Sequence, residues 1–208
     1  MKTGVDYFKQ EKRMKLPLLL AGAALAFFIS GCNEPTAYGK VDKTPYETRE
    51  CLQELAKSAE LDPSNQIDKI VVYKGKRRLY AYRNGKLVEE FCISLGKNAD
   101  KGNKIQAGDY RTPEGSYTIV RKKCDPRLYR SLMISYPNEA DKARARARGV
   151  NPGGYITIHG QPKWNADGHG DEFTLSRDWT EGCMAVPNAA MDKLWRAVKN
   201  GVKIEIHA

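Results

Sequence analysis

Alternation of apolar and polar residues dominates the chain from Ile67 onward, and it constrains the fold more than any other feature. The stretch KIVVYKGKRRLYAYRNGKLVEEFCISLG divides into three short segments of this kind. A period of two places successive side chains on opposite faces of a β-strand. Asn84-Gly85, between the second and third segments, is typical of a type I′ hairpin turn. This region is therefore predicted to form three short strands.

More strands are predicted further along the chain. A turn at Pro113-Glu114-Gly115 precedes a strand in SYTIV, YITIHG is a second, and Val202–Ile206 is the last. The polar stretch 163–172, rich in Gly and Asp, is predicted to be a loop. No internal repeat is visible. The sum predicts a mostly β domain, a β-sandwich or open barrel, with small peripheral helices.

Helix signals are fewer. TPYETRECLQELAKSAEL is predicted to be one helix that docks on the domain, with Thr44 as N-cap, Pro45 at the first position and Glu47 completing a capping box. Two further helices are predicted, at 138–148 and, behind a capping Asn188, at 189–198.

The first 31 residues are predicted to be an export signal. Basic residues precede an apolar run, 16–29, that is 14 residues long, which is short for a membrane span of about 20 residues. Ile29-Ser30-Gly31 before Cys32 resembles the lipobox of a bacterial lipoprotein. The resemblance implies lipidation at Cys32 and a place in the bacterial cell envelope, anchored to a membrane and facing the periplasm. The alternative is a buried hydrophobic helix, which the polar NEPTAYGK after Cys32 disfavours.

This division leaves a signal at 1–31, a tether with one helix at 32–66 and the main domain at 67–208. The whole chain has a formal net charge of +10, and residues 32–208 carry 30 basic and 23 acidic residues, or +7. No nucleic acid partner is expected for an exported chain without an aromatic-basic stacking motif. A positive surface suits an anionic envelope or lipid headgroups, although basic residues that only solvate the surface explain the charge equally well.

Cysteine is the residue type on which the chemistry depends. Apart from Cys32 there are four, and no C-x-x-C pair points to zinc or redox exchange. In an exported protein the four thiols can form two disulfides, or one disulfide with two free thiols. The four are Cys51, Cys92, Cys124 and Cys183.

Cys183 lies in SRDWTEGCMAVPN, behind a predicted sharp bend at Thr180-Glu181-Gly182. A thiol with a pKa of about 8.5 needs a neighbouring imidazole or N–H groups to become a thiolate. His159 is the favoured base because it ends a strand; His169 lies in the polar loop and His207 next to the chain end. The bend could also direct the N–H groups of Gly182 and Cys183 at one point, as an oxyanion hole. The alternative is a structural or disulfide-bonded cysteine.

IHG followed by DWTEGCMAVPN resembles the active-site signature of the YkuD-type L,D-transpeptidases. The resemblance extends to RRLYAYRNGKLVEEFCISLGKN, GDYRTPEGSYTI, SYPN and NPGGYITIHG, and covers residues 67–207. It departs from the family at Glu181, where a histidine is usual, so the resemblance assigns the base to His159 alone. His169 has no family counterpart and is predicted to be a solvated loop residue, the alternative being a second base or a metal ligand.

The resemblance implies a cysteine acyltransferase of the cell wall that needs no metal or organic cofactor. Its substrate is a peptidoglycan tetrapeptide stem: Cys183 forms a thioester, D-Ala leaves, and the acyl group passes to an amine. The Gly160 carbonyl would orient His159. Predicted substrate-binding residues are Tyr136, Gly160, Arg177 and Trp179, with Arg177 holding a carboxylate. The alternative for the two aromatic residues is packing.

Two segments are assigned smaller roles. Asp178 is predicted to be a turn residue or half of a structural ion pair, and Asp109 and Arg111 to belong to a structural turn.

Two other functions stay open from the sequence. Water could resolve the same thioester, giving an L,D-carboxypeptidase or an amidase that releases an anchored envelope protein from peptidoglycan. Glu181 instead leaves room for a lipid-anchored wall-binding protein without turnover.

Overall fold

The computed structural model describes residues 44–57 and 63–208. The predicted export signal, the lipidation at Cys32 and the tether up to residue 43 lie outside these residues and remain predictions. Within the described ranges, no helix combines the length and apolar character needed to cross a bilayer.

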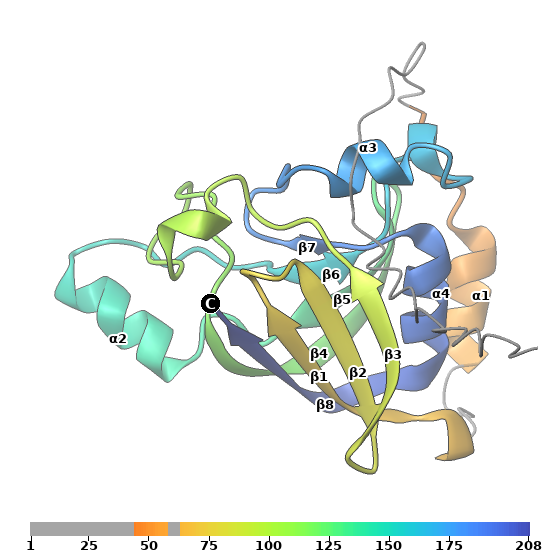
Figure 1. Cartoon of the computed structure of the whole chain (residues 1–208), viewed down its shortest axis with the longest axis horizontal. Coiled ribbons are helices and arrows are strands. Elements are labelled where there is room, and N and C mark those ends of the chain that lie inside the picture. Colours follow the sequence, from red (N-terminus) through yellow and green to blue (C-terminus); the bar gives the residue numbers. More distant parts are fainter. Residues whose placement is uncertain (1–43, 58–62) are drawn as a thin grey trace, which may run out of the picture. The chain divides into compact units, whose positions relative to one another are not determined.

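Eight strands form one mixed sheet in the order β3-β2-β1-β8-β4-β5-β6-β7 (Figure 1). Neighbours pair antiparallel except β1 with β8 and β6 with β7, which are parallel. The strands are β1 Ile67–Tyr73, β2 Arg78–Arg83, β3 Lys86–Cys92, β4 Gly115–Asp125, β5 Tyr129–Ile134, β6 Thr157–His159, β7 Met184–Ala185 and β8 Val198–His207. The sequence predicted β1, β2, β3, β4, β6 and β8 but assigned no strand to the segments that form β5 and β7.

The two edges of the sheet meet. Ser94, just after β3, and Ala185 on β7 exchange two backbone hydrogen bonds of 2.9 and 2.8 Å. The sheet therefore curls until its first and last strands are joined, and the prediction of a mostly β open barrel is confirmed. Because edge strands expose unpaired backbone groups, this bridge also protects part of both edges.

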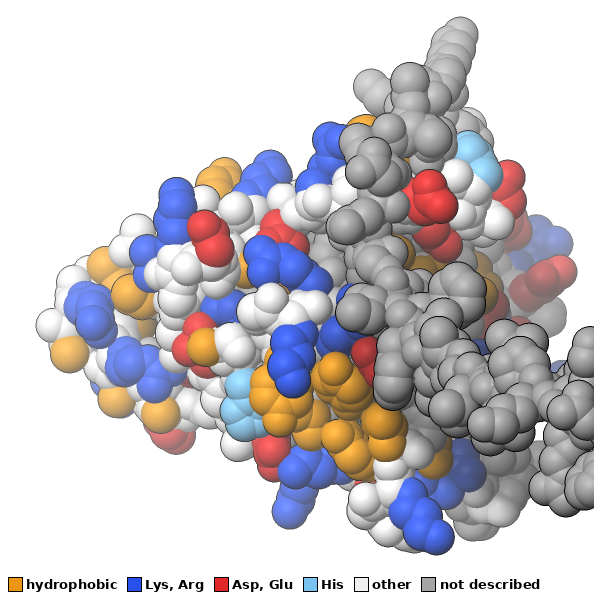
Figure 2. Space-filling view, in the orientation of Figure 1, with side chains coloured by type: hydrophobic (Ala, Val, Ile, Leu, Met, Phe, Trp, Pro, Cys, Tyr) orange, Lys and Arg blue, Asp and Glu red, His pale blue; other side chains and the backbone are white. Residues whose placement is uncertain are grey.

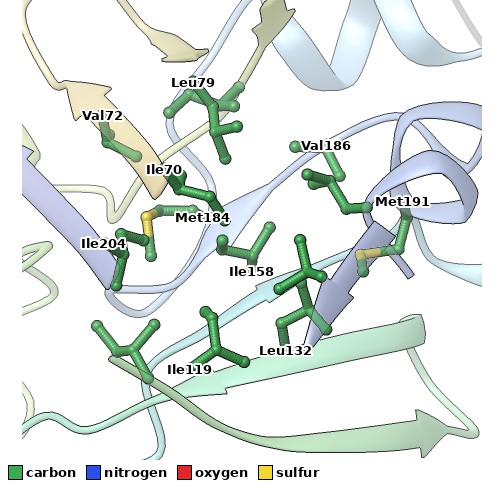
Figure 3. Close-up of a cluster of buried hydrophobic side chains, with 14 of the residues drawn as sticks. Ile70, Val72, Leu79, Ile119, Leu132, Ile158, Met184, Val186, Met191 and Ile204 are labelled. Atoms are coloured by element: carbon green, nitrogen blue, oxygen red, sulfur yellow. The ribbon is translucent and has the colours of Figure 1, made fainter. Parts of the chain in front are cut away.

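Alternation along the strands fills the interior of this curled sheet. Figure 3 shows Ile70, Leu79, Ile158, Met184 and Ile204 directed into one cluster, and each is fully buried. Burying a side chain of this size contributes about 1.5–3 kcal/mol. β6 and β7 are therefore held on their inner side by the same core as the longer strands.

The predicted hairpin turn is confirmed by its backbone angles. Asn84 and Gly85 have φ of 50° and 74°, as a type I′ turn requires at both central residues.

On the outward side of the sheet, hydrophobic side chains gather over β1 and β2 beside a histidine (Figure 2). The Tyr73 ring lies 5.9 Å from that of Tyr80 and stacks at 5.1 Å on His207.

Four α-helices surround the sheet in the described residues: α1 Arg49–Lys57, α2 Glu139–Ala147, α3 Asp171–Leu175 and α4 Asn188–Ala197. The α2 prediction is confirmed, and Asn138 caps it in a capping box with Asp141. Buried Arg130 of β5 pairs with Glu54 of α1 at 2.9 Å and with Asp192 of α4 at 3.0 Å. Both helices are thereby tied to β5.

Two local predictions about the later helices are wrong. Asn188 does not cap α4, because its Oδ1 accepts the Gln161 N–H at 2.7 Å and Pro187 takes the cap position. The predicted loop at 163–172 contains the 3₁₀ helix Lys163–Asn165 and the start of α3.

The cap predicted at Thr44 is also wrong, because tertiary contacts hold residues 44–48 outside the helix. The Tyr46 N–H donates to the Pro126 carbonyl at 2.7 Å, and its hydroxyl donates to the Gln161 carbonyl at 2.9 Å. The α1 helix therefore begins at Arg49, whose N–H is accepted by the Glu47 carboxylate.

Docking of α1 on the domain is confirmed by a disulfide. Cys51 of α1 bonds to Cys124 of β4 with a Cα–Cα distance of 5.9 Å and a sequence separation of 73. Both half-cystines are buried.

We expect the double variant Cys51→Ala/Cys124→Ala to lose about 2–5 kcal/mol of unfolding free energy, because the disulfide closes a long loop in the unfolded chain. Urea denaturation measures the loss. Cys183→Ala is the matched control and should stay within about 1–2 kcal/mol of wild type. An unchanged urea midpoint in the double variant would contradict this assignment.

Candidate active site

The pairing of β6 with β7 brings a thiol and an imidazole onto one face of the sheet. In this parallel pair Ile158 lies opposite Met184, and His159 lies opposite Ala185. Ile158 and Met184 are fully buried in the core. Since side chains alternate along a strand, His159 and Cys183 face the other side, where they line one pocket.

Cys183 is a free, half-buried thiol. Its Sγ accepts a hydrogen bond from Thr157 Oγ1 at 3.5 Å and donates to the Tyr155 carbonyl at 3.7 Å. The reading of Cys183 as a disulfide-bonded cysteine is therefore wrong.

The surroundings favour the thiolate form of Cys183. Burial alone raises the pKa of the thiol, but a hydrogen bond and a charge interaction with His159, together with hydrogen bonding to Thr157, lower it by more. The pKa therefore lies below its ordinary value. An adjacent imidazole commonly activates a cysteine in this way.

His159 is held in one orientation. It is 1 % exposed, and its Nδ1 lies 2.8 Å from the Gly160 carbonyl oxygen. Because a carbonyl only accepts, Nδ1 carries a proton and Nε2 is the nitrogen left for the sulfur. The Trp179 ring packs edge-on at 5.6 Å. The structure thus places Gly160 where the predicted orienting role requires it.

The bend before Cys183 is built on Thr180 and Gly182. Thr180 Oγ1 accepts the Gly182 N–H at 3.1 Å and donates to the Cys183 carbonyl at 2.8 Å. Gly182 has φ of +128°, and a Cβ there would lie 2.7 Å from the Arg111 carbonyl oxygen, so only glycine fits. Its N–H is already paired, which corrects its predicted place in the oxyanion hole. Of the two predicted donors, the Cys183 N–H remains.

The pocket around Cys183 has a volume of about 570 Å³. Most of its lining residues were not singled out from the sequence, among them Lys97, Tyr110, Arg127 and Tyr155. Tyr110 and Tyr155 have φ of 56° and 58°, an uncommon conformation for non-glycine residues that tends to cluster at functional sites.

Comparison with known proteins decides the family. The YkuD model, described as an L,D-transpeptidase catalytic domain, matches residues 67–206. The chain belongs to this family.

Two similar proteins match this chain over only part of their own length. The putative L,D-transpeptidase YafK of Escherichia coli K12 is 32% identical over 99 residues, which cover 47% of this chain and 32% of YafK. The helical cell shape determining protein Pgp2 of Campylobacter jejuni is 30% identical, with a TM-score of 0.51 over 67% of this chain and 47% of the Pgp2 chain. The match therefore spans about a third of YafK and about half of Pgp2.

Of the side chains predicted to contact substrate, Trp179 lines the pocket, whereas Tyr136 and Arg177 do not. Trp179 lines the pocket, as does Glu181, which is exposed. Tyr136 does not line it, because its hydroxyl donates to the Pro152 carbonyl at 2.9 Å in the core. Arg177 does not line the pocket either. Its guanidinium lies 3.7 Å from the centre of the Phe173 ring.

Two acidic residues have the structural roles that the sequence predicted. Asp178 accepts the Leu95 N–H at 2.9 Å and pairs with Arg77 at 2.6 Å. Asp109 accepts three backbone N–H groups, including that of Arg111. Burial raises the pKa of Asp109, but these hydrogen bonds and Lys104 lower it by more.

The other histidines lie elsewhere. His169 is exposed and pairs with Asp167, as a solvated loop residue would, and His207 stacks on Tyr73. Among the residues the structure describes, no group of three or more His, Cys, Asp or Glu could hold a metal ion.

We expect alkylation of Cys183 by iodoacetamide to show a pKa below the ordinary thiol value. His159→Gln should raise this pKa, because burial still disfavours the thiolate and the imidazole no longer stabilises it. At a pH below the pKa, each pKa unit of increase lowers the thiolate fraction about tenfold. The rate is followed across pH by mass spectrometry of the Cys183 peptide. His169→Gln serves as the control, and an equal shift in both variants would contradict the pairing.

Proposed function

We propose that this chain is a cysteine acyltransferase acting on peptidoglycan tetrapeptide stems. The observation that supports it best is the free Cys183 thiol, whose pKa is lowered by the oriented His159 imidazole that lines the same pocket. Membership of the L,D-transpeptidase family supplies the reaction class.

In the proposed reaction the Cys183 thiolate attacks the carbonyl that joins the third residue of the stem, a diamino acid such as diaminopimelate, to D-Ala. The oxyanion of the tetrahedral intermediate accepts the Cys183 N–H. As the C–N bond breaks, the proton on His159 Nε2 passes to the nitrogen of the departing D-Ala. A thioester between Cys183 and the stem remains.

The second half of the reaction reverses the roles. An incoming amine attacks the thioester carbonyl, and His159 Nε2 takes the proton from the amine. The C–S bond then breaks, the new amide is released, and the thiolate and protonated imidazole are restored. Throughout, the Gly160 carbonyl keeps the Nδ1 proton in place, so the same nitrogen serves both steps.

Hydrolysis of the same thioester is the second candidate. Cys183 is half-exposed and Tyr155 at the pocket is 84 % exposed, so water reaches the site in the absence of an acceptor. The products would be those of an L,D-carboxypeptidase, or of an amidase when the acyl donor is linked to an envelope protein.

Lipidation at Cys32 completes the proposal and would place the enzyme in the envelope, beside peptidoglycan. Globomycin treatment and mass spectrometry of the mature N-terminus test it; an unacylated Cys32 removes the anchor from the proposal.

Incubation of the purified protein with disaccharide-tetrapeptide should release D-Ala. Mass spectrometry of the products distinguishes cross-links between third residues, which show transfer, from shortened tripeptide stems, which show hydrolysis. If no D-Ala is released and a carbapenem leaves no adduct on reduced Cys183, the non-catalytic wall-binding function would replace this proposal.

In the same assay Cys183→Ala should abolish turnover. His159→Ala should lower it by about 10²–10⁴-fold, the usual contribution of a general base. His169→Ala is the matched control and should change the rate little. A larger loss in His169→Ala than in His159→Ala would mean that the wrong imidazole has been assigned.

A further inference from the structure

Three basic side chains line the Cys183 pocket, and two of them have no acidic partner. Buried Lys104 pairs with Asp109 at 2.7 Å, which neutralises its charge. Lys97 and Arg127 are exposed. Within residues 44–57 and 63–208, neither forms an ion pair with a carboxylate.

Lys97 is positioned by the bend that carries the nucleophile. Its N–H donates to the Thr180 carbonyl at 3.0 Å, beside the bridge between Gly96 and Thr180. Its ammonium lies 5.3 Å above the centre of the Tyr110 ring. The backbone of Lys97 is thus hydrogen-bonded to Thr180, three residues before Cys183, and its side chain reaches the pocket from the segment that follows β3.

Arg127 reaches the pocket from a different element, the turn between β4 and β5. Asp125 Oδ1 accepts the Arg127 N–H at 2.9 Å and the Leu128 N–H at 3.2 Å. Tyr46 binds the Pro126 carbonyl, and the disulfide anchors Cys124. The turn is therefore held on both sides of Arg127, while its guanidinium stays exposed.

The remaining titratable groups do not cancel these two charges. Among the described residues that line the pocket, Glu181 is the carboxylate, and it shares the lining with two unpaired cations. The pocket is also lined by the titratable groups of Tyr110, Tyr155, His159 and Cys183. A net positive rim in a partly enclosed pocket raises the local concentration of an anionic ligand.

We propose that Lys97 and Arg127 are specificity residues that select an acyl donor with free carboxylates on both sides of the attacked carbonyl. This rests on the proposed function. In a diaminopimelate-containing tetrapeptide these groups are the terminal carboxylate of D-Ala and the second carboxylate of diaminopimelate. The guanidinium of Arg127 can bind a carboxylate through two parallel hydrogen bonds, whereas Lys97 offers a point charge. Together they take the role that the sequence assigned to Arg177.

The test compares KM and kcat for disaccharide-tetrapeptide with both carboxylates free and for the same compound amidated at one carboxylate at a time. Lys97→Ala and Arg127→Ala should each raise KM for the free compound by about 3–10-fold with kcat nearly unchanged. Each variant should lose the distinction between the free compound and the one amidated at the carboxylate it binds. Arg127→Lys and Lys97→Arg should recover part of the affinity.

Lys86→Ala is the matched control. Lys86 is exposed at the hairpin end of β3, about 20 Å along the strand from the end that leads to Lys97. It should leave KM and its salt dependence unchanged. For wild type KM should rise with ionic strength, and the rise should weaken in Lys97→Ala and Arg127→Ala, because screening acts on exposed charges.

The outcomes separate this inference from the function on which it rests. Wild-type turnover with equal KM for free and amidated donors, or variants with wild-type KM and salt dependence, overturns the inference and leaves the acyltransferase intact. If wild type neither releases D-Ala nor forms an adduct on Cys183, both fall. The pH midpoint of Cys183 alkylation, unchanged in each variant, verifies that the thiol and His159 are undisturbed.

Discussion

The register of β6 against β7 is the constraint on which the site depends. With Ile158 opposite Met184, both apolar side chains enter the core, and their neighbours His159 and Cys183 share the outer face. A slip of one residue would send every side chain of one strand to the opposite face, burying the thiol among hydrocarbon and separating it from the imidazole. The core packing of two short strands therefore determines the chemistry on their other side.

The pKa of Cys183 depends on a balance between burial of the thiol and its interaction with the His159 ring. Burial opposes the thiolate, and His159 and Thr157 outweigh it. Glu181, where the resemblance to the family leads one to expect a histidine, is not among the groups that shift this balance. The sulfur accepts a hydrogen bond from Thr157 and donates one to the Tyr155 carbonyl, and His159 lowers its pKa. The departure at Glu181 thus leaves the thiol's contacts complete, which weakens the main reason for a non-catalytic wall-binding protein.

Features that depend on neighbours in the sequence could be predicted, and those that depend on distant contacts could not. Alternation predicted β1 to β3, and Asn84-Gly85 predicted the turn between β2 and β3, since each of these signals acts within a few residues. Thr44 and Asn188 have the right chemistry for caps, yet Tyr46 and the Gln161 N–H hold those segments otherwise.

The candidate site follows the same rule. The Cys183 and His159 pairing could be predicted because strand ends and bends are local, and because the family signature links them. The position of Arg127 in the pocket could not be predicted. A single arginine in a turn has no sequence pattern that links it to Cys183, and the two residues are brought together by the tertiary fold. Tyr136 and Arg177 do not line the pocket, because the Tyr136 hydroxyl donates to the Pro152 carbonyl and the Arg177 guanidinium packs on the Phe173 ring.

The segment before Ile67 also bears on the site, although it lies outside the residues that match the family. Cys124, Asp125, Pro126 and Arg127 are consecutive, and the first and third are bound by Cys51 and Tyr46. The contacts that stabilise α1 against the sheet therefore fix the turn that carries one of the two unpaired cations. A loosened turn would cost Arg127 its fixed position and increase the entropy lost when a carboxylate binds, so the N-terminal segment stabilises the fold and preorganises the pocket through the same few residues.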